Sequence, residues 1–357
     1  MKKLLHSLKY INIVRAVSLL LSVCLFTSVC HGCTVKETET KKENVTSEEK
    51  INIGMAFDSF VIERWQRDRD VFVSTAKEMG AEVNVQNANG DVEEQKRQIQ
   101  YFIDNDVDVI VIICIDADAL SDEVQKARNA GIKVIAYDRI IRESNIDLYI
   151  SFDNKTVGTQ MGNALIESGI GEGDDVIMIG GSPMDYNVPA LEEGFMEVME
   201  ENGVNISDVT HCDGWKAELA TDYMYENADK VAQAEAIMCG NDYIASKVVS
   251  VLSEQRLAGS VKVTGQDADL EACQRIVEGT QLMTVYKPVD DLAKRAAECA
   301  IKLAKGEDIE AERTINDGKY DVPYISLTPI PVNAEDMDEI IIESGFHTKE
   351  DVYLNAQ

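Results

Sequence analysis

Charged and amide side chains follow directly after short apolar stretches at several points of the chain, and the clearest example spans residues 132–154. One apolar stretch there leads into Asp138 and Arg139, and a second leads into Asp153 and Asn154. Continuous β-branched stretches of this kind are typical of strands in parallel sheets that are covered on both faces. Polar residues just past the carboxyl ends of such strands lie where open α/β sheets bind ligands. The pattern predicts a ligand site, although either aspartate alone could instead end a strand or cap the following helix.

The same arrangement recurs along the chain, which suggests one site assembled from many strand ends. The residues concerned are Asp58, Arg64, Trp65, Asp138, Arg139, Asp153, Asp185, Asn187, Trp215, Asn241, Asp267 and Lys287. Planar polar groups can donate to and accept from adjacent hydroxyls, and indole faces cover the C–H faces of a sugar ring. The set therefore predicts a carbohydrate site in which Trp65 and Trp215 lie on either side of the ring. Core packing is the alternative for either tryptophan alone, because Trp is highly buried on average.

Predicted strands and helices alternate through most of the chain, with short connections that often contain glycine. Crossovers of helix length between strands predict parallel, doubly wound sheets. The alternation restarts after Asn154, so we expect an α/β protein of two lobes with a cleft between them. We expect a hinge of three chain crossings, at residues 151–154, 284–287 and 323–328. The predicted division places residues 51–152 and 287–326 in the first lobe, and residues 153–286 and 327–357 in the second.

The charge and motif content of the chain argue against several classes of function. The 34 basic and 64 acidic residues give a net charge of −30. Phosphate backbones attract clustered Lys and Arg, so we expect no nucleic-acid binding. The sequence contains no Walker-type phosphate loop, no G-x-S-x-G elbow and no H-E-x-x-H pair. We expect a binding protein that is not an enzyme and needs no cofactor or metal, although the many acids leave a carboxylate pair at glycosidase spacing open.

The first 33 residues have the features of an export signal. Four basic residues lie within the first 15, and residues 16–29 form an uncharged apolar run that is short for a transmembrane helix. A small residue and Cys33 follow, and then a polar tract. The arrangement resembles a bacterial lipoprotein signal, in which residues 1–32 are removed, Cys33 is lipidated and residues 33–50 form a tether. We expect an extracytoplasmic protein held at the cell membrane; an uncleaved anchor is the alternative.

The cysteines beyond Cys33 do not suggest a disulfide framework. They are odd in number and scattered: Cys114, Cys212, Cys239, Cys273 and Cys299. A free cysteine within an apolar stretch behaves as a small hydrophobic residue. We expect these thiols to be unpaired.

Several stretches of the chain resemble the D-xylose-binding proteins of bacterial sugar uptake, in the type I periplasmic-binding-protein superfamily. The stretches are IGMAFDSFVIERWQRDRDVF, QNANGDVEEQ, GIKVIAYDRII, DLYISFDNKTVG, GGSPMDYN, DGW, GQDAD, GTQLMTVYKP and LTPIPVN. The resemblance runs from about residue 51 to the tail. It implies a two-lobed fold that binds D-xylose or a related aldose in the cleft. It also implies sugar contacts from Arg64, Trp65, Asp138, Arg139, Asp185, Asn187, Trp215, Asn241, Asp267 and Lys287.

The resemblance leaves the output of sugar binding open. The implied partner is the permease of an ABC transporter, and the alternative is a membrane sensor histidine kinase that reports the sugar. Both outputs need a closed, liganded form with a distinct surface. Sugar-responsive repressors share the two-lobed core but carry a basic helix-turn-helix, whereas this chain begins with an export signal. Two departures from the family pattern, Ser59 in place of an acidic residue and Pro189 in the first turn of a helix, bear on fine specificity.

Overall fold

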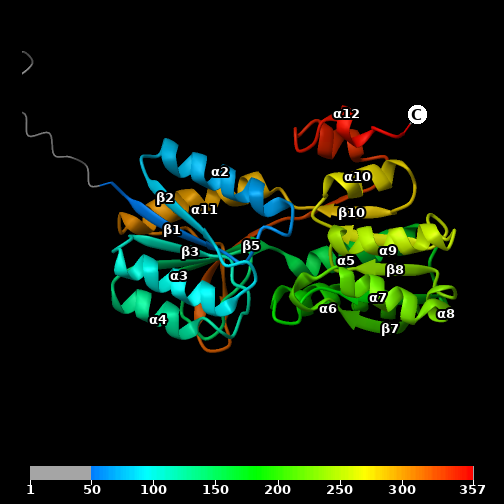
Figure 1. The fold of residues 1–357 in the computed structure, drawn as a ribbon, viewed down its shortest axis with the longest axis horizontal. Helices are drawn as coiled ribbons and strands as arrows, with labels where there is room; N and C mark the ends of the chain where they lie inside the picture. The colour runs from blue at the N-terminus through cyan, green and yellow to red at the C-terminus, as the bar shows by residue number, and fades with distance from the viewer. Residues whose placement is uncertain (1–49, 357) are drawn as a thin grey trace, which may run out of the picture. The chain divides into compact units, whose positions relative to one another are not determined.

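The computed structural model describes residues 50–356, whose strands form two sheets (Figure 1). The first sheet contains β1 (Asn52–Phe57), β2 (Glu82–Asn87), β3 (Val109–Ile112), β4 (Lys133–Tyr137), β5 (Leu148–Phe152), β11 (Arg313–Asn316) and β12 (Asp321–Leu327), in the order β11-β12-β5-β4-β3-β1-β2. The second contains β6 (Asp175–Gly180), β7 (Asn205–His211), β8 (Ala236–Cys239), β9 (Lys262–Gln266), β10 (Met283–Tyr286) and β13 (Ile330–Val332), in the order β13-β10-β9-β8-β6-β7.

Helices cover both faces of the first sheet, which explains why its central strands are apolar throughout. In β1, Met55 and Phe57 belong to one apolar cluster and Ala56 belongs to another, because successive side chains of a strand point to opposite faces. One face is covered by α2 (Arg64–Glu78) and α11 (Val289–Ala304), and the other by α3 (Val92–Asp104) and α4 (Ser121–Asn129) (Figure 1).

The second sheet is covered in the same way. Helices α5 (Asn154–Glu167) and α6 (Asn187–Glu201) lie on one face, and α7 (Glu218–Glu226) and α9 (Asp242–Glu254) lie on the other. Three shorter helices are α8 (Ala228–Val231), α10 (Leu270–Val277) and α12 (Lys349–Val352). The approach of α5 to α6 requires glycine: a Cβ on Gly158 would lie 1.8 Å from the carbonyl oxygen of Leu191, and one on Gly194 would lie 2.1 Å from that of Lys155.

The chain passes from one sheet to the other at three connections. Strand β5 of the first sheet ends at Phe152 before α5, and β10 of the second ends at Tyr286 before α11. Strand β12 of the first sheet ends at Leu327, and β13 of the second begins at Ile330. Each passage directly follows a strand, so a polar residue at that point lies next to both sheets.

The predicted fold class, an α/β protein with two doubly wound sheets, is confirmed, and the sheets add antiparallel edges that the sequence pattern does not reveal. Strand β11 pairs antiparallel with β12, and β13 pairs antiparallel with β10. Strand β11 is largely exposed and β13 has only three residues, so neither contains a long apolar run like those that identify the central strands.

The C-terminal tail contacts helices of both sheets. Helix α12 packs on α10, and the carbonyl oxygen of Phe346 accepts a hydrogen bond from Arg67 Nη1 of α2 at 3.1 Å. The sequence pattern assigns the tail to the second lobe alone and does not predict this contact with α2, which covers the first sheet.

Two further expectations concern the cysteines and the membrane. Cys114, Cys212, Cys239, Cys273 and Cys299 are all unpaired and buried, which confirms the prediction for these thiols. Within residues 50–356, no helix combines the length and the apolar character needed to cross a membrane. The predicted export signal and Cys33 lie outside the described residues.

Candidate ligand-binding site

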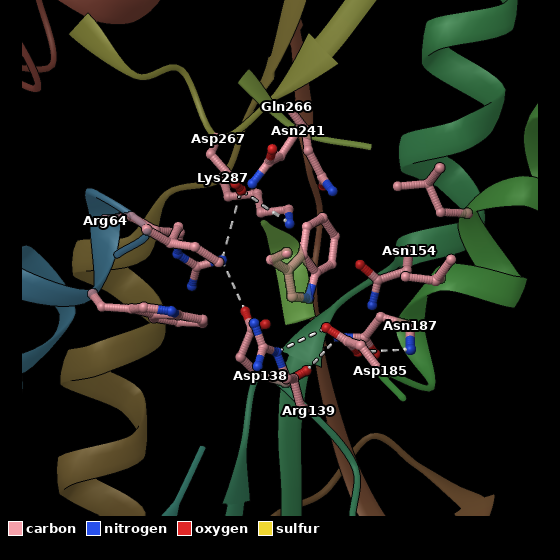
Figure 2. A pocket seen from close by; sticks show the side chains of 15 residues that line it. Arg64, Asp138, Arg139, Asn154, Asp185, Asn187, Asn241, Gln266, Asp267 and Lys287 are labelled. Carbon is pink, nitrogen blue, oxygen red and sulfur yellow. Dashed lines mark hydrogen bonds and ion pairs between the residues drawn. The ribbon is translucent and has the colours of Figure 1, made fainter. Parts of the chain in front are cut away.

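A narrow cavity of about 30 Å³ lies at the carboxyl ends of the strands, and side chains from both sheets line it (Figure 2). The lining residues are Ile62, Arg64, Trp65, Asp138, Arg139, Asn154, Asp185, Asn187, Val188, Leu191, Trp215, Asn241, Gln266, Asp267 and Lys287. All ten residues that the resemblance implies as sugar contacts are therefore brought to one cavity. Their contact with a sugar stays a prediction.

Elements of the first sheet supply four of these residues. Arg64 and Trp65 open α2, and Asp138 and Arg139 directly follow β4. Lys287 follows β10 at the passage back to the first sheet.

Elements of the second sheet supply the others. Asp185 lies in the loop after β6, Asn187 opens α6 and Trp215 lies in a short 3₁₀ turn after β7. Asn241 caps α9 because its Oδ1 accepts a hydrogen bond from Ile244 N at 2.9 Å. Asp267 directly follows β9.

Arg64 is the centre of one ion-pair network at the cavity. Its Nη1 lies 2.9 Å from Asp138 Oδ2 and 3.9 Å from Asp267 Oδ1. Its Nε and Nη2 donate to both oxygens of Asp68 at 3.2 and 3.1 Å, and Lys287 Nζ lies 3.2 Å from Asp267 Oδ1. Figure 2 shows the side chains of Arg64, Asp138, Asp267 and Lys287 pointing toward one another across the cavity. The network fixes the rotamers of the charged groups, so the site is pre-organised.

Arg139 is the centre of a second network that joins the two sheets. Its Nη1 donates to Asp58 Oδ2 at 2.8 Å, and its Nε lies 2.8 Å from Asp185 Oδ2. Nη1 also donates to the carbonyl oxygen of Cys114 at 3.2 Å. Because Asp58 comes from the first sheet and Asp185 from the loop after β6, the guanidinium links both sides of the cavity.

The protonation states follow from burial and from this pairing. Burial opposes ionisation of Asp138, but the charges of Arg64, Lys287 and Arg139 outweigh it and lower the pKa of Asp138. Burial raises the pKa of Asp185 and of Asp58, which share the single charge of Arg139. Asp138 is therefore the most firmly ionised of these three carboxyl groups.

The charges that line the cavity balance. Arg64, Arg139 and Lys287 are positive, and the carboxylates of Asp138, Asp185 and Asp267 are negative, which gives 3 − 3 = 0. Two further acids, Asp58 and Asp68, lie behind the arginines, and burial raises their pKa as it raises that of Asp185, so the balance is one of the formal charges of the lining side chains. A lining of this kind suits a ligand without net charge, because an ionic ligand would leave one buried charge uncompensated.

Several buried polar atoms around the cavity have no hydrogen-bond partner among the described residues. They are Trp65 Nε1, Trp215 Nε1, Gln266 Oε1, Asp138 Oδ2 and Asp267 Oδ1. The two carboxylate oxygens lie within ion-pair distance of Arg64, but the geometry is not that of a hydrogen bond. Buried polar atoms are normally hydrogen-bonded. Donors and acceptors therefore coexist around the cavity, as a ligand rich in hydroxyls requires.

The two tryptophans come from opposite sides, but they are not equally exposed. Trp65 is 1% exposed and lies against Arg64, whose Cζ is 4.5 Å from the ring centroid. Trp215 is half-buried, and its ring lies over Gly181, where a Cβ would be 2.2 Å from the indole. Glycine at position 181 is therefore needed for the indole to lie this close to the backbone just after β6. The predicted sandwich of a sugar ring between the indoles stays a prediction.

Five lining residues were not among the ten predicted contacts: Ile62, Asn154, Val188, Leu191 and Gln266. Asn154 and Gln266 are polar residues at strand ends, so the same pattern could have identified them. Asp153, which the strand-end pattern does single out, does not line the cavity. It caps α5 by accepting from Thr156 N at 3.2 Å and lies 3.3 Å from Arg313, so for this residue the capping alternative is the right one.

The site also contains no metal-binding group within the described part of the chain. No three His, Cys, Asp or Glu side chains there are placed to hold a metal ion. The charged groups are instead paired with one another, and the arrangement favours binding through hydrogen bonds.

Known proteins resemble the chain over most of its length. Residues 53–308 match the family model described as "Periplasmic binding protein domain". The D-xylose-binding periplasmic protein of Haemophilus influenzae is 41% identical over 309 residues, which cover 85% of this chain and 92% of the relative. The protein of the same name from Escherichia coli K12 is 42% identical and covers 85% and 93%.

Solved structures agree with the fold. An ABC transporter solute-binding protein from Clostridium phytofermentans with bound β-D-glucose superimposes with a TM-score of 0.77 at 27% identity, covering 84% of this chain and 99% of that chain. A carbohydrate transporter solute-binding protein from Chloroflexus aurantiacus in complex with D-glucose has a TM-score of 0.78 at 25% identity, covering 85% and 98%. The matched proteins are binding proteins, which confirms the expectation that the chain is not an enzyme. The chain belongs to the periplasmic binding protein family.

Proposed function

We propose that the protein binds a neutral monosaccharide, with D-xylose as the first candidate, in the cavity between its two sheets. The observation that carries the proposal is the lining: three positive and three negative side chains in balance, with unpaired donors and acceptors beside them. Two relatives of about 40% identity that bear the name of D-xylose-binding proteins support the choice of sugar.

Charge discrimination follows from the lining. A uronate would bring a carboxylate, and an amino sugar an ammonium group, into a lining whose positive and negative side chains are already paired with one another. Each would leave a charge without a partner in a buried site, which costs several kcal/mol. Neutral aldoses avoid this cost and use the same hydrogen-bonding groups.

We further propose that the two sheets with their helices act as lobes that close on the sugar. The proposed first lobe comprises residues 51–152 and 287–326, and the second comprises residues 153–286 and 327–357. The three passages between the sheets would be the hinge, because few backbone dihedrals there need to change. A ligand that contacts both sides favours the closed form by its differential affinity.

The closed, liganded protein is proposed to present its sugar to the permease of an ABC transporter outside the cytoplasm. Cys33 is the proposed lipid anchor that holds the protein at the membrane. Replacing Cys33 by Ser should release the protein from the membrane fraction and change its mobility on gels. Membrane attachment that survives the substitution would contradict the lipid anchor and would leave the sugar site unaffected.

Titration calorimetry of the chain from residue 34 onward tests the ligand class. The panel comprises D-xylose, D-ribose and D-glucose as neutral sugars, and D-glucuronate and D-glucosamine as charged controls. We expect D-xylose to bind most tightly and the charged sugars to bind at least about a hundredfold more weakly, because each leaves a buried charge unpaired. Equal affinity for a charged sugar would contradict the charge-balance argument, and no binding of any neutral sugar would contradict the proposed function.

A further inference from the structure

The backbone of Asp138 adopts a strained turn at the centre of the cavity. Its φ is +64°, in the left-handed region that residues other than glycine rarely occupy. The amide of Arg139 donates to the carbonyl oxygen of Tyr137 at 2.7 Å, which closes a three-residue γ-turn around Asp138. This turn directs two consecutive side chains, Asp138 and Arg139, toward the cavity. Such strain persists only where surrounding contacts hold it.

The carbonyl oxygen of Asp138 is the group by which the turn is held. Three side chains lie within donor distance of it: Ser151 Oγ at 2.6 Å, Asn187 Nδ2 at 2.9 Å and Tyr149 Oη at 3.1 Å. Ser151 and Tyr149 lie on β5, beside β4 in the same sheet. Asn187 belongs to α6, which covers the second sheet, so its bond forms across the cleft (Figure 2).

Tyr149 has one hydroxyl proton and two acceptors within reach. Its Oη lies 3.1 Å from the carbonyl oxygen of Asp138 and 2.9 Å from Asn187 Oδ1. The orientation of the Asn187 amide is determined by its partners, because a carbonyl can only accept and must face Nδ2. Oδ1 is then turned toward the tyrosine hydroxyl. With Asn187 in place, the proton of Tyr149 goes to Oδ1 and the amide of Asn187 satisfies the carbonyl.

We infer that Tyr149 is a positioning residue that exchanges its hydrogen-bond acceptor when the protein closes on its ligand. The new acceptor is Oδ1 of Asn187. In the open form Tyr149 donates to the carbonyl of Asp138; in the closed form it donates to Asn187, which takes over the carbonyl. The inference rests on the proposed function, since it assumes a cleft that opens and closes around a sugar. The turn that carries Asp138 and Arg139 is held in both forms.

The surroundings of Tyr149 suit this role. The side chain is 2% exposed, and its ring stacks on Tyr324 with centroids 4.8 Å apart and an angle of 14°. The ring is therefore fixed and only the hydroxyl proton needs to rotate. Burial raises the pKa of Tyr149 well above its ordinary value, so the hydroxyl keeps its proton throughout the neutral range. Tyr149 does not line the cavity and makes no contact with the proposed sugar position.

Stopped-flow fluorescence of D-xylose binding tests the inference, because Trp65 and Trp215 both line the cavity. Tyr149→Phe removes only the hydroxyl and keeps the stacked ring. We expect about three- to tenfold faster dissociation with an unchanged association rate. Without the hydroxyl, the closed form leaves Asn187 Oδ1 buried without a donor, whereas in the open cleft water can replace the hydroxyl at the carbonyl of Asp138. Asn187→Ala should have a similar or larger effect, and the double variant should dissociate no faster than Asn187→Ala, because the two changes remove one linked arrangement. Tyr324→Phe is the control: it removes the hydroxyl of the other stacked ring and should leave both rates within about twofold.

The outcomes separate this inference from the proposed function. Unchanged dissociation in Tyr149→Phe, or rates that multiply in the double variant, would overturn the acceptor exchange while sugar binding stands. If the wild-type protein binds no neutral sugar, the proposed function fails. Hydrogen exchange of the backbone amides of residues 133–143 in the ligand-free protein then tests whether Tyr149 holds the carbonyl oxygen of Asp138. Tyr149→Phe removes the donor of the open form and should then exchange faster than Tyr324→Phe, and equal exchange in these two variants would overturn the inference.

Discussion

Asp138 has two separate roles within one residue. Its carboxylate is paired with Arg64 at 2.9 Å and has its pKa lowered by the neighbouring positive charges. Its carbonyl oxygen is held by donors from both sides of the cleft. A substitution of the side chain therefore tests the ligand contact and leaves the backbone donors in place.

Replacing Asp138 by Asn should weaken D-xylose binding by about tenfold to a hundredfold. The amide keeps the size of the side chain but loses a charge-assisted interaction worth about 1.5–3 kcal/mol. Arg64 keeps Asp68 as a partner, so the fold should survive. Calorimetry measures the affinity, and Asp153→Asn is the matched control because Asn also caps a helix and Asp153 does not line the cavity. A lower melting temperature with unchanged affinity would show that Asp138 acts on structure alone.

At the scale of elements, the crossing of α5 and α6 positions one side of the cavity. Gly158 and Gly194 allow the two helices to touch at backbone distance. Asn154 opens α5, and Asn187 opens α6 beside Leu191, so the separation of the helices sets where these three residues stand.

Replacing Gly158 by Ala should destabilise the protein by about 1–3 kcal/mol, because the new Cβ would meet the carbonyl of Leu191 at 1.8 Å and force the helices apart. Affinity for D-xylose should fall as well, since Leu191 lines the cavity. Urea unfolding and calorimetry measure the two effects. Gly171→Ala is the control, because nothing lies within 4 Å of its added Cβ and its φ is not positive. Equal stability of the two variants would contradict the required close approach.

The first turn of α9 contains a buried acid outside the cavity, Asp242. Burial raises its pKa from 3.8 to about 7, and it accepts hydrogen bonds from Thr284 Oγ1 at 2.6 Å and Gln281 Nε2 at 2.8 Å. The acids Asp269 and Asp267 and the guanidinium of Arg275 also act on it. Asp269 adds a second carboxyl group whose pKa is raised by burial.

This acid should make stability depend on pH in a defined direction. The folded-state pKa lies above the unfolded value of about 3.9, so the folded protein binds more protons between about pH 4 and 7. The stabilisation is fully present below the unfolded pKa and is lost as pH rises through the folded pKa. Asp242→Asn cannot ionise, so its melting temperature relative to wild type should be higher at about pH 7.5 than at about pH 5.

The control for this variant is Asp122→Asn, which changes an exposed acid in the first turn of α4. The difference in melting temperature between Asp122→Asn and wild type should be the same at both pH values. If the difference in melting temperature between Asp242→Asn and wild type is equal at both pH values, Asp242 ionises alike in the folded and unfolded protein, which would contradict the prediction.

At the scale of the whole molecule, ion pairs and hydrogen bonds that join the two sheets are the basis of the proposed closure. Arg139 bridges Asp58 and Asp185, and Asn187 reaches the carbonyl of Asp138. A sugar in the cavity adds contacts to both sides at once. Binding, stability and shape should therefore change together.

Saturating D-xylose should raise the melting temperature and reduce the radius of gyration measured by small-angle X-ray scattering. Ligand at about 100 times its dissociation constant adds about 2.7 kcal/mol to the free energy of unfolding. L-Arabinose and D-glucuronate serve as comparison ligands in the same two measurements. A melting shift without compaction would support binding and contradict closure about the three passages.

The sequence by itself determined the architecture and most of the polar residues that line the cavity. Apolar strands alternating with helices specify doubly wound sheets, because each strand must be covered on both faces. Polar residues placed just after those strands are brought together by the parallel arrangement itself, and this is why Arg64, Asp138 and Lys287 could be predicted to share a site without knowledge of their partners.

Only the tertiary structure decided what each of these residues does there. Asp153 and Asn154 are neighbours in the chain, yet the first caps α5 and the second lines the cavity, because the start of the helix directs their side chains differently. The partners of Asn187, namely Tyr149 and the carbonyl of Asp138, are 38 and 49 residues away and lie across the cleft. Contacts of that kind depend on how the two sheets meet and on a left-handed turn at a residue that is not glycine. Neither leaves a periodic pattern in the sequence, so neither could be predicted from it.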